Sequence, residues 1–387
     1  MGISPMIGST EIDLALGTNS ELAMLLAAMA YAVALVVFTL DLVRSSRTVQ
    51  ELEQSLLAQE DKELVGVGGA VRVSKGARSA TARGGAAAQS GTAGTGGTGA
   101  GDDASSGTAP RVRHGNAEVD GQLVDDSMDY TRGAPRRGLA RVAISLMALA
   151  AVIHLAAVIM RSIAAGRVPW GNMYEFLTTG ALIVAVVFLV ALIFKDIRFM
   201  GVFVSALVVV MMCAATMGFP TPVQPLQPAL QSPWLIIHVS IAVLSSALFT
   251  LTFAMAVLQL IQSYRQKALI QGKPDRLPLM RLVPSATSLE NVAYRINALA
   301  FVGWSITLIL GAVWAEAAWG RYWGWDVKEV WTFIIWVIYA GYLHARATRG
   351  WTGNRSAWLS IVGYACVVFN FTAVNIIFPG LHSYAGT

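Results

Sequence analysis

The sequence predicts an all-α membrane protein, a polytopic bundle of about eight transmembrane helices with both termini on the extracytoplasmic side. The first observation is composition: 55% of the 387 residues are hydrophobic and only 13% are charged, whereas soluble domains carry about 25% charged residues. The second is that eight apolar stretches approach or exceed the length needed to cross about 30 Å of hydrocarbon as helix. The third is that basic residues concentrate in alternate loops, as the positive-inside rule expects.

The predicted spans are of unequal length. The seventh is short, but its flanking aromatic residues and Arg346 extend it through the interface. Four residues, 195–198, separate the third and fourth spans, which predicts a tight hairpin. The first twenty residues are polar and lack a basic segment, so they do not read as a cleaved signal peptide. The spans cover residues 21–43, 139–164, 174–195, 199–218, 234–262, 296–315, 331–346 and 357–378.

The basic residues predict which loops face the cytoplasm. Of the 28 Lys and Arg residues, all but four fall in one set of alternate loops, which we assign to the cytoplasm. The loops at 165–173, 219–233 and 316–330 and both termini then lie outside the plasma membrane. This topology explains the net charge of +5, and no nucleic-acid partner is needed. The four exceptions are Arg161, Arg167, Arg321 and Lys328.

Composition divides the chain into three segments. Residues 1–44 hold the first predicted span, residues 45–137 form a predicted cytoplasmic insert, and residues 138–387 hold the other seven spans. Within the insert, residues 77–106 are almost entirely Gly, Ala, Ser and Thr, and such a sequence lacks the apolar side chains that form a core. We therefore predict that the insert is largely disordered and that its His114 is an ordinary solvated histidine.

The most unusual stretch is the predicted outer loop 314–331, which contains five tryptophans and a tyrosine. Aromatic residues at a membrane interface often form a belt, but a belt is usually spread over many helix ends. Here the rings are gathered in one loop, where Gly320 and Gly324 allow tight turns or close approach of the backbone to a flat surface. We interpret the loop as an aromatic shelf for a large planar apolar ligand. The alternative is a belt combined with interhelical packing.

Two predicted helix starts carry capping patterns. Asp326 and Glu329 form a D-x-x-E box at the start of the seventh span, and Asn172 and Glu175 repeat it as N-x-x-E at the third. We interpret both pairs as mainly structural. For the first pair, the alternatives are ion pairing with the two basic residues of the loop, or contact with a ligand propionate through those bases. For the second pair, the alternative is contact with a ligand or substrate.

Four histidines lie in or beside the predicted spans, where an ionisable side chain suggests a function. His238, one turn into the fifth span, and His382, just past the eighth, both lie at the depth of the tryptophan loop. Two neutral imidazoles on either side of a flat apolar platform can supply the two axial ligands of a haem iron. His344, at the inner end of the seventh span, is either an inner ligand or an interfacial residue. For His154, in the middle of the second span, we expect a packed histidine that bonds a neighbouring helix.

The motifs around these residues closely resemble those of the system II cytochrome c biogenesis proteins, the CcsA/ResC family of tryptophan-rich (WWD) haem-handling membrane proteins. The resemblance covers roughly residues 139–387, which form the cytochrome c assembly domain in this interpretation. The N-terminal helix and the insert fall outside it. The motifs are GNMYE at 171–175, HVS at 238–240, WGRYWGWD at 319–326, KEVW at 328–331, YLHAR at 342–346 and LHSY at 381–384.

The resemblance implies that b-type haem crosses the membrane and is held at its outer surface before covalent attachment to apocytochrome c. It implies that His238 and His382 are the external axial ligands of the iron and that His344 is the intramembrane ligand. It places the following residues in the haem-binding loop: Trp319, Gly320, Tyr322, Trp323, Trp325 and Asp326.

The implied partners are a ResB-like membrane subunit, which supplies the second intramembrane ligand, and apocytochrome c with its C-x-x-C-H site. Membrane lipid surrounds the chain. Cys213 and Cys366 lie in separate apolar runs and form no C-x-x-C pair, so reductant is expected from separate thiol-disulfide proteins. No acid/base couple stands out, which leaves the catalyst of the cytochrome c synthase (haem lyase) complex undecided. The alternatives to haem handling are a small-molecule permease and a structural membrane subunit with an aromatic interface loop.

Overall fold

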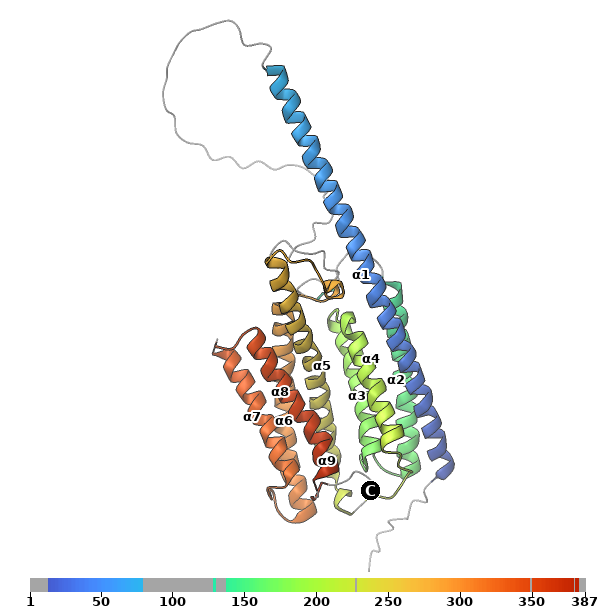
Figure 1. Cartoon of the computed structure of the whole chain (residues 1–387). Helices are drawn as coiled ribbons and strands as arrows, with labels where there is room; N and C mark the ends of the chain where they lie inside the picture. The colour runs from blue at the N-terminus through green and yellow to red at the C-terminus, as the bar shows by residue number, and fades with distance from the viewer. Residues whose placement is uncertain are drawn as a thin grey trace, which may run out of the picture.

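The computed structural model describes residues 13–78, 128–129, 137–226, 228–348, 350–378 and 380–382. Within these residues every regular element is a helix, and the predicted all-α bundle is confirmed (Figure 1). The long helices are α1 (Leu14–Arg78), α2 (Gly138–Ala165), α3 (Met173–Phe194), α4 (Gly201–Cys213), α5 (Pro233–Ile270), α6 (Ala286–Trp319), α7 (Val327–Ala347) and α8 (Asn354–Phe371), followed by the short α9 (Ala373–Ile377). Single helical turns precede α4, α5 and α6: η1 (Arg198–Met200), η3 (Pro228–Leu230) and η4 (Pro278–Leu282).

Seven of the described helical segments are long and apolar enough to cross a membrane. They match seven of the eight predicted spans. The eighth, predicted at 331–346, corresponds to α7, whose 21 residues extend about 32 Å at 1.5 Å per residue. Tryptophans, tyrosines and a histidine make α7 less apolar than the others. It nevertheless packs beside α6 and α8 as part of the same bundle (Figure 1).

The first helix is longer than its predicted span of 21–43. It begins at Leu14 and continues to Arg78, so residues 45–78 of the predicted insert are helical. The first part of that stretch, residues 50–64, is rich in Glu, Gln and Leu, which are good helix formers. The low-complexity residues from 79 on, and His114, lie outside the described residues.

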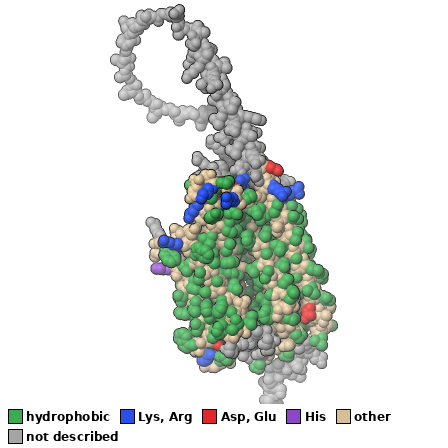
Figure 2. All heavy atoms as spheres, in the orientation of Figure 1, with side chains coloured by type: hydrophobic (Ala, Val, Ile, Leu, Met, Phe, Trp, Pro, Cys, Tyr) green, Lys and Arg blue, Asp and Glu red, His purple; other side chains and the backbone are tan. Residues whose placement is uncertain are grey.

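The loops fall at two ends of the bundle in the predicted alternation (Figure 1). One end carries the start of α1, the α2–α3 loop, the segment before α5, the α6–α7 loop and α9. We call it the tryptophan end. The other end carries the α3–α4 hairpin and the α5–α6 and α7–α8 loops. Most of the Lys and Arg side chains visible in Figure 2 gather near this second end. The side of the membrane on which each end lies stays a prediction.

Local signals explain where the helices next to the tryptophan end begin and stop. At Asp326 the predicted capping box of α7 is confirmed, since the N-cap and Glu329 side chains each accept a backbone N–H of the other residue. The Asn172 side chain accepts the Glu175 N–H at 2.9 Å and starts α3. Gly320 ends α6 with φ of 71°, a left-handed conformation that favours glycine. These caps fix the loops between which the candidate site lies.

Hydrogen bonds between polar side chains join helices α5, α6, α7 and α8 in the second half of the bundle. Thr252 of α5 donates to Asn297 Oδ1 of α6 at 2.6 Å, and Asn297 donates to Ser360 of α8 at 3.3 Å. Asn370 of α8 donates to the hydroxyl of Thr332 on α7. Because such groups have few other partners in an apolar bundle, these bonds help to set how the helices align.

Candidate functional site

Two histidines from distant parts of the chain meet at one buried indole. His238 of α5 stacks on Trp314 of α6, with ring centroids 5.8 Å apart and an interplanar angle of 18°. His382, which follows α9, meets the same indole edge-on at 5.5 Å and also contacts Trp319 at 4.9 Å. The structure therefore brings together the two residues predicted as external ligands, both in contact with Trp314.

The ring of His238 is held by the backbone of α6. Its Nδ1 lies 3.0 Å from the carbonyl oxygen of Thr307, and a carbonyl only accepts, so Nδ1 carries the proton. Nε2 is then the nitrogen that has a lone pair for a metal. Gly311 makes room for the ring, since a Cβ at this position would lie 2.8 Å from His238 Cε1. Any larger residue at 311 would displace the imidazole.

The ring of His382 is held by a carboxylate. Its Nδ1 lies 2.6 Å from Asp326 Oδ2. Burial lowers the pKa of His382, against the opposing effect of Asp326, while the hydrogen bond to His382 lowers the pKa of Asp326. The arrangement favours an ionised carboxylate that accepts from a neutral imidazole, which again leaves Nε2 for a metal. Histidine ligands of metals are commonly oriented by a carboxylate in this way.

Two adjoining cavities share a wall made of His238, Trp314, Lys328 and His382. The first cavity lies toward α3 and α5 and has an empty volume of about 660 Å³, including its open mouth. The second lies toward the α6–α7 loop and has about 450 Å³. Apolar and aromatic side chains form most of the first cavity: Trp170, Met173, Phe176, Leu230, Leu235 and Phe371.

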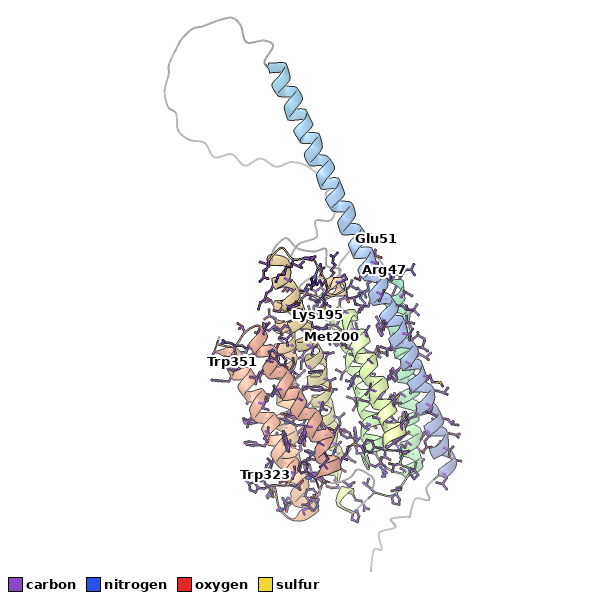
Figure 3. The ribbon with its side chains drawn as sticks, in the orientation of Figure 1. Arg47, Glu51, Lys195, Met200, Trp323 and Trp351 are labelled. Atoms are coloured by element: carbon purple, nitrogen blue, oxygen red, sulfur yellow. The ribbon has the colours of Figure 1, made fainter. Side chains whose placement is uncertain are left out.

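The tryptophan loop contributes to the site unequally. Trp323, labelled at the tryptophan end in Figure 3, lines the second cavity with Tyr322. Trp325 lines neither cavity, although it meets Trp323 edge-on at 5.9 Å. Its side chain is 75% exposed, and its φ of 60° is left-handed, which is unusual for a residue with a Cβ. Trp323 therefore faces the second cavity, whereas Trp325 lies outside both cavities. The two indoles do not form a single shelf.

A buried ion cluster holds the wall of the first cavity that comes from the α2–α3 loop. Glu175, fully buried at the start of α3, accepts from Arg167 at 2.7 and 3.1 Å and from Arg161 at 3.1 Å. It also accepts the Gly171 N–H at 2.8 Å. The neighbouring Asn172 both caps α3 and lines the cavity. The structural interpretation of Glu175 thus gains support, and Asn172 is in reach of a bound molecule.

The other two membrane histidines lie apart from this site. His344 is exposed near the opposite end of α7. His154 is fully buried in α2 and meets Tyr31 of α1 edge-on at 5.8 Å. It is packed as expected. Neither ring nitrogen has a hydrogen-bond partner at normal distance among the described residues, but the ring interacts with the backbone of Thr178 in the neighbouring helix α3.

Sequence reasoning did not single out Trp314 and Asn375 as site residues, and it raised Lys328 only as one of two loop bases through which a ligand propionate could be contacted. Trp314 begins the aromatic run, but only packing shows that its ring contacts two histidines. Lys328 carried a usable signal, since it is one of the few basic residues at the predicted outer end. Asn375, in α9, receives a hydrogen bond from Lys328 of α7.

Comparison with known proteins decides the family. A model of the family described as cytochrome C assembly protein matches residues 170–382. This chain belongs to the cytochrome c assembly protein family. It is 34% identical over 292 residues to the cytochrome c biogenesis protein CcsA of Synechococcus elongatus, covering 65% of this chain and 88% of the relative. It is 36% identical over 241 residues to CcsA of Guillardia theta, covering 58% and 79%.

In this cytochrome c assembly protein the region matched by the family model contains the whole candidate site. The match begins at Trp170 and ends at His382, and both residues line the first cavity. It therefore includes the cavity walls, the tryptophan loop and both histidines that meet at Trp314. The family assignment supports a role in cytochrome c maturation and, in general terms, in haem handling.

Proposed function

We propose that this chain holds haem at the tryptophan end and presents it for covalent attachment to apocytochrome c. The observation that carries the proposal is the convergence of His238 and His382 on Trp314, each with Nδ1 bound to an acceptor. Both imidazoles thereby keep Nε2 for an iron ion, and the surrounding cavities are lined mainly by apolar and aromatic side chains. This donor set and this lining fit a haem with two axial histidines.

The contribution of the chain is to bind and orient. Haem supplies two vinyl groups, and each forms a thioether when a cysteine S–H of apocytochrome c adds across its double bond. Thr307 and Asp326 fix the two imidazoles, and Trp314, Trp319 and Trp323 provide flat apolar surfaces. Holding the reacting groups in place removes much of the entropic barrier to such an addition. In this proposal the chain is the haem-handling subunit of a cytochrome c synthase.

The proposal extends to the opposite end of the bundle. His344 is exposed on α7, so a ligand bound there would need a second chain to complete its coordination. We assign that role to a ResB-like membrane subunit. The incoming haem is of the b type in this proposal. The free cysteines Cys213 and Cys366 lie on different helices, which fits a reductant supplied by separate thiol-disulfide proteins. The tryptophan end faces the extracytoplasmic side of the plasma membrane in this scheme.

The test is cytochrome c maturation in cells. The chain is expressed with a ResB-like partner and a C-x-x-C-H reporter in a bacterium that lacks its own maturation system, and haem-stained gels measure covalent attachment. Wild type is expected to mature the reporter, and His238→Ala and His382→Ala to lose most of it at equal protein level. His154→Ala serves as the matched control. Full maturation by both site variants would contradict the proposal. Failure of the wild-type chain would favour a permease or a structural subunit.

A further inference from the structure

Lys328 has an unusual position for a lysine. It is the second residue of α7, at the positive end of the helix dipole, where a cation is disfavoured. Its side chain is mostly buried, and it forms part of the wall between the two cavities. The ammonium is thus held inside the site rather than in bulk water.

The acidic groups nearby are already engaged. Glu329 pairs with Arg321 at 3.3 Å and accepts the backbone N–H groups of Gly324 and Asp326. The carboxylate of Asp326 receives the ring of His382. Neither carboxylate lies within 4.0 Å of the Lys328 ammonium, for which the described part of the chain shows no ion pair.

The groups that do contact the ammonium are neutral. Its Nζ donates to Asn375 Oδ1 and lies 5.4 Å from the ring centroid of Phe371. An amide oxygen and a ring face stabilise a cation, but they do not neutralise it, and a buried charge without a counter-charge is costly. Asp326 attracts the ammonium electrostatically, but no carboxylate of the described residues lies within ion-pair distance of it, so an anionic group of a ligand can still bind it directly.

We propose that Lys328 binds a carboxylate of the ligand that fills the first cavity, and that this contact sets the direction in which the ligand lies. The inference rests on the function proposed above, in which the ligand is haem and the carboxylate is a propionate. Asn172 and Asn375 line the same cavity and can donate to a carboxylate, while the remaining lining is mostly apolar. The cavity thus suits an apolar body with one anionic end.

The contact gives the ligand an orientation. The two propionates of haem lie on one half of the macrocycle, and the two vinyl groups lie on the other. A propionate held at Lys328 leaves the vinyl-bearing half directed away from the ammonium. Arg321 is the poorer candidate for this role because Glu329 already neutralises it. A charged contact made only by correctly oriented haem would also reject porphyrins that lack carboxylates.

The experiment compares two ligands that differ only in their carboxylates. Fe(III) protoporphyrin IX and its dimethyl ester are titrated into the purified full-length chain in detergent, and Soret absorbance measures binding. Lys328→Met is expected to weaken binding of the acid at least tenfold and to leave binding of the ester unchanged. Lys328→Arg is expected to retain most of the affinity, and Lys195→Met, at the opposite end of the bundle, serves as the charge-loss control.

The outcomes separate the two proposals. The role of Lys328 would be overturned, and the proposed function left standing, by either of two results. Lys328→Met could bind Fe(III) protoporphyrin IX as tightly as wild type, or its affinity for the porphyrin and for the dimethyl ester could fall by the same factor. Wild-type protein that binds neither porphyrin would overturn the proposed function and this inference together. A melting curve of Lys328→Met identifies any general loss of folding. In that case Lys328→Arg is decisive, because intact binding by this variant shows that the positive charge, and not the packing of the lysine side chain, binds the ligand.

Discussion

Nδ1 of His382 lies 2.6 Å from the carboxylate Oδ2 of Asp326. This hydrogen bond joins the segment after α9 to the N-cap residue of α7. Asp326 therefore has two tasks, because it also caps α7 through the box with Glu329. The first task fixes the direction of the imidazole, and the second fixes the loop that carries the tryptophans. The two tasks can be separated by substitution.

Asp326→Asn is expected to keep the helix and weaken the site. Asparagine is as good an N-cap as aspartate, so helical content and melting temperature should change little. The loss of the carboxylate removes the charged partner of His382, and such changes typically cost about 10–100-fold in metal affinity. Haem titration followed at the Soret band measures the effect. Unchanged haem affinity in Asp326→Asn would show that His382 needs no carboxylate.

Trp323→Ala and Trp325→Gly are expected to act on function without unfolding the chain. Trp323 lines the second cavity, so its loss should reduce haem retention at normal helical content. Trp325 is held at φ 60°, a conformation that costs a residue with a Cβ about 1–2 kcal/mol. Glycine relieves that strain, so Trp325→Gly should melt no lower than wild type, and it should still retain less haem because Trp323 loses its edge-on contact with Trp325. Normal haem retention in both variants would remove the support for a ligand role of the loop.

Glu175→Gln is expected to destabilise the chain strongly. The substitution leaves the buried guanidinium of Arg161 without its nearest carboxylate, and breaking a buried ion pair in this way typically costs about 3–5 kcal/mol. The matched control is Glu21→Gln, whose half-exposed side chain lies 3.8 Å from the same arginine. Exposed pairs contribute about 0–1 kcal/mol. Thermal melting in detergent measures both variants. Equal decreases in melting temperature would argue against the buried ion cluster as the main support of the α2–α3 loop.

The loop after α5 should make stability sensitive to acid. Burial raises the pKa of Asp275, but hydrogen bonds from Arg265, Arg281 and the Leu277 N–H outweigh it and bring the pKa down to about 2. A carboxyl whose pKa is lower in the folded chain stabilises it above the unfolded pKa, near 4, and loses this effect as the pH falls toward 2. Asp275→Asn should therefore melt below wild type at pH 7, with the difference shrinking between pH 4 and 2. A difference independent of pH would show a role other than charge.

Much of the fold follows from local signals in the sequence. Hydropathy locates the spans, and the boxes at Asp326 and Asn172 locate two helix starts, because both depend on residues a few positions apart. The predicted length of α1 is too short, because residues 44–64 are largely polar and a search for apolar spans stops before them. The hairpin at 195–198 needed only the short separation between two apolar stretches.

The geometry of the site follows less directly. Sequence placed His238 and His382 at one depth but gave no reason for both to contact one indole, because that depends on how α5, α6 and the segment after α9 pack. The outward position of Trp325 depends on one backbone angle. That Lys328 has no carboxylate within ion-pair distance among the described residues becomes clear only when the partners of Arg321, Asp326 and Glu329 are all known.

The most direct measurement of the central claim is the visible spectrum of the chain purified with its membrane partner from haem-replete cells. The wild-type chain is expected to show a Soret band with the features of low-spin iron bound by two histidines. His238→Ala and His382→Ala should each weaken that band and lose those features, added imidazole should restore them, and His154→Ala should match wild type. A colourless wild-type preparation, or a spectrum unchanged by both site substitutions, would contradict haem ligation by His238 and His382.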